Sequence, residues 1–176
     1  MKYDDFIVGE TFKTKSLHIT EEEIIQFATT FDPQYMHIDK EKAEQSRFKG
    51  IIASGMHTLS ISFKLWVEEG KYGEEVVAGT QMNNVKFIKP VYPGNTLYVI
   101  AEITNKKSIK KENGLVTVSL STYNENEEIV FKGEVTALSN HRYGLLHCFV
   151  IHLYRIFYYR SHIAHHTLYL RFWHCS

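Results

Sequence analysis

Two side chains that can exchange protons, Asp32 and His37, lie in the same short stretch of the sequence, and a glycine-marked helix start, Ser54-Gly55, follows. A carboxylate accepts a proton, and an imidazole accepts or donates one. The first N–H groups of a helix are free to polarise a carbonyl oxygen. Together these groups suit proton transfer beside a carbonyl group.

Each of these residues also has a purely structural interpretation. An aspartate before a proline, such as Asp32, suits an Asx-turn, and Asp39 suits the cap of a short helix through Lys42 and Ala43. A lone histidine such as His37 is commonly a packed or surface residue. Spacing alone leaves both interpretations open.

Ser54 and His57 have two interpretations as well. Ser54 either orients Asp32 through a hydrogen bond or caps the helix that begins there. For His57, in the first turn of that helix, we expect a packing role, with a position facing the pocket as the alternative.

The elements that position these residues begin with a strand predicted over Thr11–Leu17. A capping box at Thr20–Glu23 then opens a short helix through Phe27. A second helix is predicted from Ser54 to Glu69, with Gly70 placed to end it. Apolar residues cover most of its circumference, so we expect it to be buried on several sides.

The rest of the pattern indicates strands separated by turn residues. The expected strands are Val76–Ile88, Thr96–Thr104, Leu115–Tyr123 and Glu128–Leu138, and the expected turns are Pro93-Gly94, Asn113-Gly114 and Asn124-Glu125-Asn126. One long apolar helix followed by such a meander predicts an α+β fold, in which a curved antiparallel sheet wraps around the helix.

Ordered motifs along the chain resemble those of the MaoC-like dehydratases, which include the (R)-specific enoyl-CoA hydratases. The resemblance covers roughly residues 8–138 and implies a hot-dog fold and usually a dimer. The matching residues are Asp32 to His37, Asp39, Phe48, Gly50, Ser54-Gly55 and Pro90-Val91-Tyr92-Pro93-Gly94-Asn95-Thr96-Leu97.

The resemblance also implies roles for residues of the site. Asp32 and His37 would occupy the catalytic positions and hold the water that adds to a trans-2-enoyl thioester. The N–H of Gly55 or Met56 would polarise the thioester carbonyl, and Ser54 would lie beside the substrate. Tyr35 and Met36 would line an acyl channel, with core packing as the alternative for both.

Two departures from the family pattern leave the acyl group open. The usual Asp-x-Asn-Pro-x-His is replaced by residues 32–37, Asp-Pro-Gln-Tyr-Met-His, and the usual His-Gly by Ser54-Gly55. The expected function is an enoyl-CoA or enoyl-ACP hydratase/dehydratase that needs no cofactor or metal beyond the CoA or acyl carrier protein of its substrate. A hot-dog thioesterase and a non-catalytic acyl-thioester-binding subunit are the alternatives.

Composition bounds the class of protein. The chain has 176 residues, 44% of them hydrophobic, which suits one domain. Its 20 basic and 20 acidic residues include no dense Lys/Arg cluster, so nucleic acid is not an expected partner. The acidic start, Met1–Asp5, lacks the pattern of a secretory signal, and we expect a cytoplasmic protein with no membrane association whose Cys148 and Cys175 are free thiols.

The composition changes abruptly near Ser139. Residues 139–176 contain no Lys, Asp or Glu but include seven of the ten histidines and both cysteines. Without the four arginines of this tail, residues 1–138 have 16 basic against 20 acidic residues, a formal charge of −4. The tail could be a membrane-associated segment, a metal site at His162, His165 and His166, or sequence not selected to fold. We favour the last, and place the domain at residues 1–138.

Overall fold

The computed structural model describes residues 1–142. The predictions for the tail, apart from its first four residues, therefore lie outside the described residues. In chain order the elements are η1 (Tyr3–Asp5), β1 (Thr11–Lys13), β2 (Leu17–His18), α1 (Glu21–Phe31), α2 (Tyr35–Ile38), α3 (Lys40–Gln45), α4 (Gly55–Glu68), η2 (Gly73–Glu75), β3 (Val76–Phe87), β4 (Thr96–Ser108), β5 (Asn113–Tyr123) and β6 (Ile129–Asn140).

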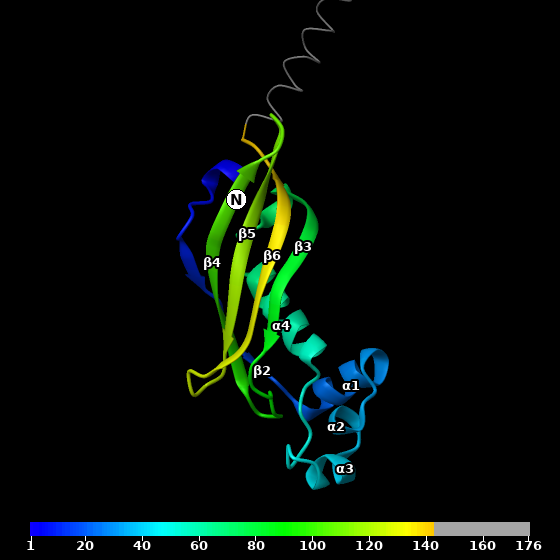
Figure 1. The fold of residues 1–176 in the computed structure, drawn as a ribbon. Helices are drawn as coiled ribbons and strands as arrows, with labels where there is room; N and C mark the ends of the chain where they lie inside the picture. Colours follow the sequence, from blue (N-terminus) through cyan, green and yellow to red (C-terminus); the bar gives the residue numbers. More distant parts are fainter. Residues whose placement is uncertain (143–176) are drawn as a thin grey trace, which may run out of the picture.

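The strands form one antiparallel sheet that packs against α4. Its strand order is β1-β4-β5-β6-β3, and β2 pairs separately with β4. Helix α4 contacts β4, β5 and β6, while α1, α2 and α3 gather at the end of the sheet where α4 begins (Figure 1). The predicted α+β hot-dog arrangement is confirmed.

Helix α4 has nearly the predicted bounds, because its two ends are chemically marked. The Ser54 side chain accepts the Met56 N–H at the start, and Gly70 follows the end with a φ of +74°. Burial differs from the prediction. Leu65 and Trp66 are buried against the sheet, but the apolar side chains of Phe63 and Val67 are exposed in the single chain.

The first predicted strand is interrupted. Residues 14–16 leave the ladder between β1 and β2, and Thr14 there makes two hydrogen bonds with the backbone of Val99, one from its N–H and one to its hydroxyl. A side chain that replaces a backbone acceptor ends regular pairing.

The turn predicted at Asn113-Gly114 is wrong. Both residues lie in β5, paired with Asn140 and Ser139 of β6, and the reversal falls at residues 110–112. Gly114 serves close packing instead, because a Cβ built on it would overlap the Tyr3 ring.

Among residues 1–142, no helix combines the length and the apolar character that a membrane crossing requires. The expected cytoplasmic location stays a prediction.

Substitution of Gly114 by Ala is expected to lower the free energy of unfolding by about 1–3 kcal/mol, because the new methyl group forces the Tyr3 ring to move. Urea denaturation measures the change. Gly50→Ala is the matched control, since a Cβ at Gly50 meets no atom within 4 Å. Equal stabilities for the two variants would contradict the packing argument.

Candidate active site

Asp32 lies where α1 has to end. Its N–H still donates to the Ala28 carbonyl oxygen, but its φ of −153° and ψ of 70° are not helical, and Pro33 follows. A proline disfavours helical geometry in the residue before it. The Asp32 side chain is therefore held at the carboxyl end of α1, facing the start of α4.

His37 is placed by α2, a single helical turn within the stretch between Asp32 and Asp39. The side chain is buried, and its Nδ1 lies 2.7 Å from the carbonyl oxygen of Ile52. A carbonyl oxygen only accepts hydrogen bonds, so Nδ1 carries a hydrogen. Nε2 is thereby directed at Asp32, with 3.5 Å between Nε2 and Oδ2.

Ser54 joins this pair to α4. The hydroxyl is fully buried, donates to Asp32 Oδ2 over 2.5 Å and accepts the Met56 N–H at 3.2 Å. The two interpretations of Ser54, capping the helix and orienting the carboxylate, are therefore both correct.

Hydrogen bonds hold Asp32 in its ionised form. The Ser54 hydroxyl lowers the pKa of Asp32 most, the Gln34 side-chain amide, 2.8 Å from Oδ1, lowers it next, and the charge of His37 also contributes. Each donor favours the carboxylate over the neutral acid. Asp32 is thus a charged hydrogen-bond acceptor at neutral pH.

The start of α4 leaves the backbone N–H of Gly55 free. Met56 uses its N–H to cap the helix, whereas the N–H of Gly55 has no acceptor among residues 1–142. A Cβ at Gly55 would lie 3.0 Å from the Phe87 ring, so a glycine fits there best. The helix dipole adds partial positive charge at this point.

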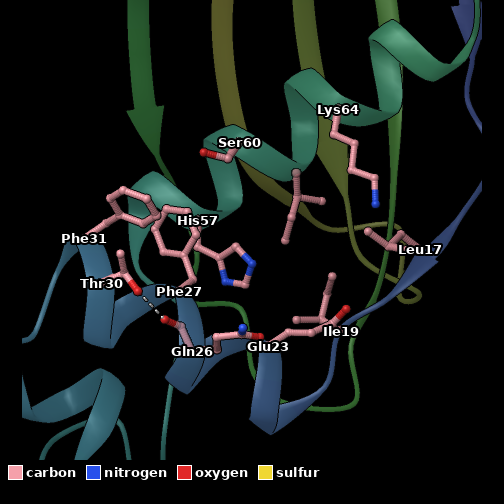
Figure 2. Close-up of a pocket in the computed structure, with 11 residues that line it drawn as sticks. Leu17, Ile19, Glu23, Gln26, Phe27, Thr30, Phe31, His57, Ser60 and Lys64 are labelled. Carbon is pink, nitrogen blue, oxygen red and sulfur yellow. Dashed lines mark hydrogen bonds between the residues drawn. The ribbon is translucent and has the colours of Figure 1, made fainter.

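Two cavities lie near the pair, and His37 lines one of them, whereas Asp32 lines neither. One, of about 320 Å³, includes His37 and Gly55 together with the basic residues Arg47 and Lys89. The other, of about 400 Å³, lies between α1 and α4 and is lined by Phe31, the chain neighbour of Asp32, and by other residues drawn in Figure 2.

The structure does not bring every predicted residue into the site. The side chains of Tyr35 and Met56 are exposed, and neither lines either cavity. His57 stacks on Phe27, with ring centroids 4.5 Å apart, and also lines the larger cavity. Asp39 caps α3 by accepting the Lys42 N–H at 3.1 Å, as its structural interpretation predicts.

Two groups that hydrogen-bond Asp32 and His37 were not predicted from the sequence. Gln34 was identifiable in principle, because an amide two residues after an aspartate can reach its carboxylate. The role of the Ile52 carbonyl could not be predicted from the sequence, since every residue has a backbone carbonyl. Within residues 1–142, no group of three or more His, Cys, Asp and Glu side chains is arranged to hold a metal ion.

A curved sheet around a central helix, with an Asp–His pair at the start of that helix, places this protein among the hot-dog proteins. A family model described as "MaoC like domain" matches residues 5–124. The chain belongs to this family, and the resemblance inferred from the motifs is confirmed.

Three similar proteins illustrate the relationship. YdeM of Bacillus subtilis is 56% identical over 138 residues, 78% of this chain and 98% of that protein. 3-Hydroxyacyl-thioester dehydratase Z of Mycobacterium tuberculosis is 31% identical over 113 residues, 62% of this chain and 72% of that protein. The crystal structure of the MaoC-like dehydratase from Rhodospirillum rubrum has a TM-score of 0.72 at 27% identity, covering 81% of this chain and 98% of that one.

Substitution of Ser54 by Ala is expected to raise the pKa of Asp32, because it removes the strongest of the hydrogen bonds that lower it. NMR titration of the carboxyl carbon measures the pKa. The depressed pKa means that these contacts stabilise the fold above the unfolded-state pKa and lose this effect as pH falls through the folded-state pKa.

The control is Ser60→Ala in the same helix, whose hydroxyl bonds only the Met56 carbonyl oxygen and is exposed. It should leave the pKa of Asp32 unchanged. An unchanged pKa of Asp32 in the Ser54→Ala variant would mean that Ser54 does not hold the carboxylate in its ionised form.

Proposed function

We propose that this protein is an acyl-thioester hydratase/dehydratase that adds water to a trans-2-enoyl thioester. One observation carries the proposal: Asp32 Oδ2 and His37 Nε2 face each other across 3.5 Å beside the unpaired N–H of Gly55. Membership of the MaoC-like family and the thioester dehydratase named among the relatives support this class of reaction.

The geometry suits a water held by both side chains. Because Nδ1 of His37 is committed to Ile52, only Nε2 faces the space beside Asp32. A water there hydrogen-bonds Oδ2 and Nε2 together, and its oxygen lone pair is directed toward the substrate. Holding reactants in this way supplies much of the rate of a bimolecular step.

The proposed addition conserves protons. The water oxygen bonds to C3 of the enoyl group as one water proton passes to the Asp32 carboxylate. His37, with a proton on Nε2, gives that proton to C2. The proton on Asp32 then returns to Nε2 across the short gap between the two side chains. The reverse sequence is dehydration.

The Gly55 N–H is proposed to bind the thioester carbonyl oxygen, which gains negative charge as water adds. A single donor of this kind is typically worth about 3–4 kcal/mol in the transition state. Because the reaction moves only water and a proton, it calls for no redox cofactor. The carrier, CoA or acyl carrier protein, is part of the substrate.

The carrier is proposed to enter along the smaller cavity. Arg47 and Lys89 line it beside Gly55, and a cation there suits the phosphate groups of CoA or of a carrier-protein arm. Lys89 is also paired with Glu128 at 2.5 Å, so Arg47 is the better candidate for a phosphate contact.

The variants Asp32→Asn and His37→Ala are each expected to lose at least about 10²-fold in kcat for hydration of a trans-2-enoyl-CoA, because each removes a proton-transfer group. Loss of the enoyl-thioester absorbance measures the rate. The matched controls are Asp39→Asn, which retains a helix cap, and His18→Ala, whose side chain is exposed; both should keep the activity.

Three other outcomes would overturn the proposal. Undiminished turnover in both site variants would remove the pair from the reaction. Release of the CoA thiol from a saturated acyl-CoA would indicate a thioesterase. Tight binding of enoyl-CoAs without turnover at any chain length would indicate a non-catalytic binding subunit.

A homodimer is proposed to form on β3. This strand ends the sheet within residues 1–142, so one edge of its backbone is unpaired. Its side chains Val77, Met82, Val85 and Phe87 are exposed. Met82 also lines a mostly apolar cavity of about 480 Å³ together with the exposed Phe63 and Val67 of α4. A long apolar edge of this kind is normally covered in the native protein, and a second copy pairing β3 with β3 would cover it.

The dimer predicts a solution mass twice the 20.6 kDa of the chain. Met82→Glu is expected to give monomers, because it places a charge in the covered region. Ile109→Glu, at an equally exposed apolar residue away from β3, is the matched control and should stay dimeric. Analytical ultracentrifugation measures the solution mass of each protein. A monomeric unsubstituted protein would exclude the β3 dimer.

A further inference from the structure

The cavity between α1 and α4 is lined by apolar and polar side chains, and one of the polar ones is a buried histidine. Leu17, Ile19, Phe27 and Ile61 are among its walls. The ring of His57 projects from α4 into the space bordered by Phe27 and Ile19 (Figure 2). Only 8% of His57 is exposed. The other polar residues of the lining are exposed to solvent, so the buried imidazole is the polar group that needs an explanation.

Nδ1 of His57 is buried without a hydrogen-bond partner. One face of the ring is covered by Phe27, whose plane is within 8° of it. Stacking explains why the ring is held flat, but it supplies no hydrogen bond to the imidazole. A buried imidazole without hydrogen bonds costs free energy, which a ligand in the cavity that bonds the ring can recover.

We infer that His57 binds an uncharged hydrogen-bonding group, such as a hydroxyl, on the acyl chain of the substrate. The inference rests on the proposed function, because it takes the acyl chain to run from the Asp32–His37 pair into this cavity. It adds a substrate class, acyl thioesters with a polar group along the chain, and makes His57 a specificity-determining residue.

The position of His57 suits a chain that starts at the reacting carbons. Ser54, which bonds Asp32, is three residues before His57, so the two differ by about 4.5 Å along the helix axis. Phe31, next to Asp32, lines the same cavity. A chain that leaves C3 between these residues meets the imidazole a few carbons further on.

An uncharged group fits better than a carboxylate. Burial lowers the pKa of His57, so the ring is neutral at neutral pH and offers one donor and one acceptor. The charged residues around the cavity are Glu23 and Lys64. Glu23 accepts the N–H and hydroxyl of Thr20 and would repel a carboxylate, while Lys64 is exposed and lies 3.7 Å from Glu68.

Calorimetric binding of hexanoyl-CoA and its ω-hydroxy counterpart to the full chain tests the inference without requiring turnover, because neither saturated thioester can be hydrated. We expect the hydroxylated thioester to bind about 10-fold more tightly. His57→Leu should abolish this preference, and His57→Gln, which keeps a donor and an acceptor, should retain part of it. Circular dichroism of each variant checks the fold.

An equal preference for the ω-hydroxy thioester in the unsubstituted protein and in His57→Leu would overturn the inference. Tighter binding of hexanoyl-CoA than of the ω-hydroxy thioester by the unsubstituted protein would overturn it as well. Binding of neither thioester would overturn it too. If the protein hydrates no enoyl-CoA but still binds the ω-hydroxy thioester more tightly than hexanoyl-CoA, the proposed reaction is overturned and the role of His57 stands. If hydration depends on Asp32 but the two saturated thioesters bind equally tightly, the role of His57 is overturned and the proposed reaction stands.

Discussion

The site depends on the buried hydroxyl of Ser54, which bonds the end of α1 to the start of α4. The hydroxyl has no access to water, so both of its hydrogen bonds have to be made within the protein. It donates to Asp32 and accepts from Met56. The first contact keeps the carboxylate ionised and oriented, and the second satisfies the Met56 N–H, while the neighbouring Gly55 N–H stays free. One residue therefore connects the Asp32 carboxylate to the helix whose first N–H is proposed to bind the thioester carbonyl.

The packing of α4 gives this connection its rigidity. Trp66 and Leu65 bury the helix against the sheet, and the segment between the pair and Ser54 is tied down by backbone bonds from Ile52 to Met36 and from Ala53 to Val91. His37 bonds the Ile52 carbonyl oxygen in the same segment. Asp32 and His37, the proposed proton-transfer groups, are thus both held in place by the start of one buried helix and the segment before it, which is the preorganisation that efficient catalysis needs.

Sequence predicted the features that local chemistry marks. Ser54 and Gly70 bracket α4, the Thr20–Glu23 box starts α1, and the motif containing Asp32 and His37 identified the family. The misses arose from distant contacts. Asn113-Gly114 has turn composition, but the two residues pair with Asn140 and Ser139 of β6 and so belong to β5. The α2 turn, the Ile52 carbonyl and the unsatisfied nitrogen of His57 depend on how segments meet, which no local pattern records.

Isotope labelling tests the central claim most directly. The protein is incubated with a trans-2-enoyl-CoA in H₂¹⁸O, and the products are analysed by mass spectrometry. Hydration predicts an intact thioester with ¹⁸O at C3. Recovery of enoyl-CoA alone, with no labelled 3-hydroxyacyl-CoA, or appearance of ¹⁸O only in a released carboxylic acid, would contradict the account.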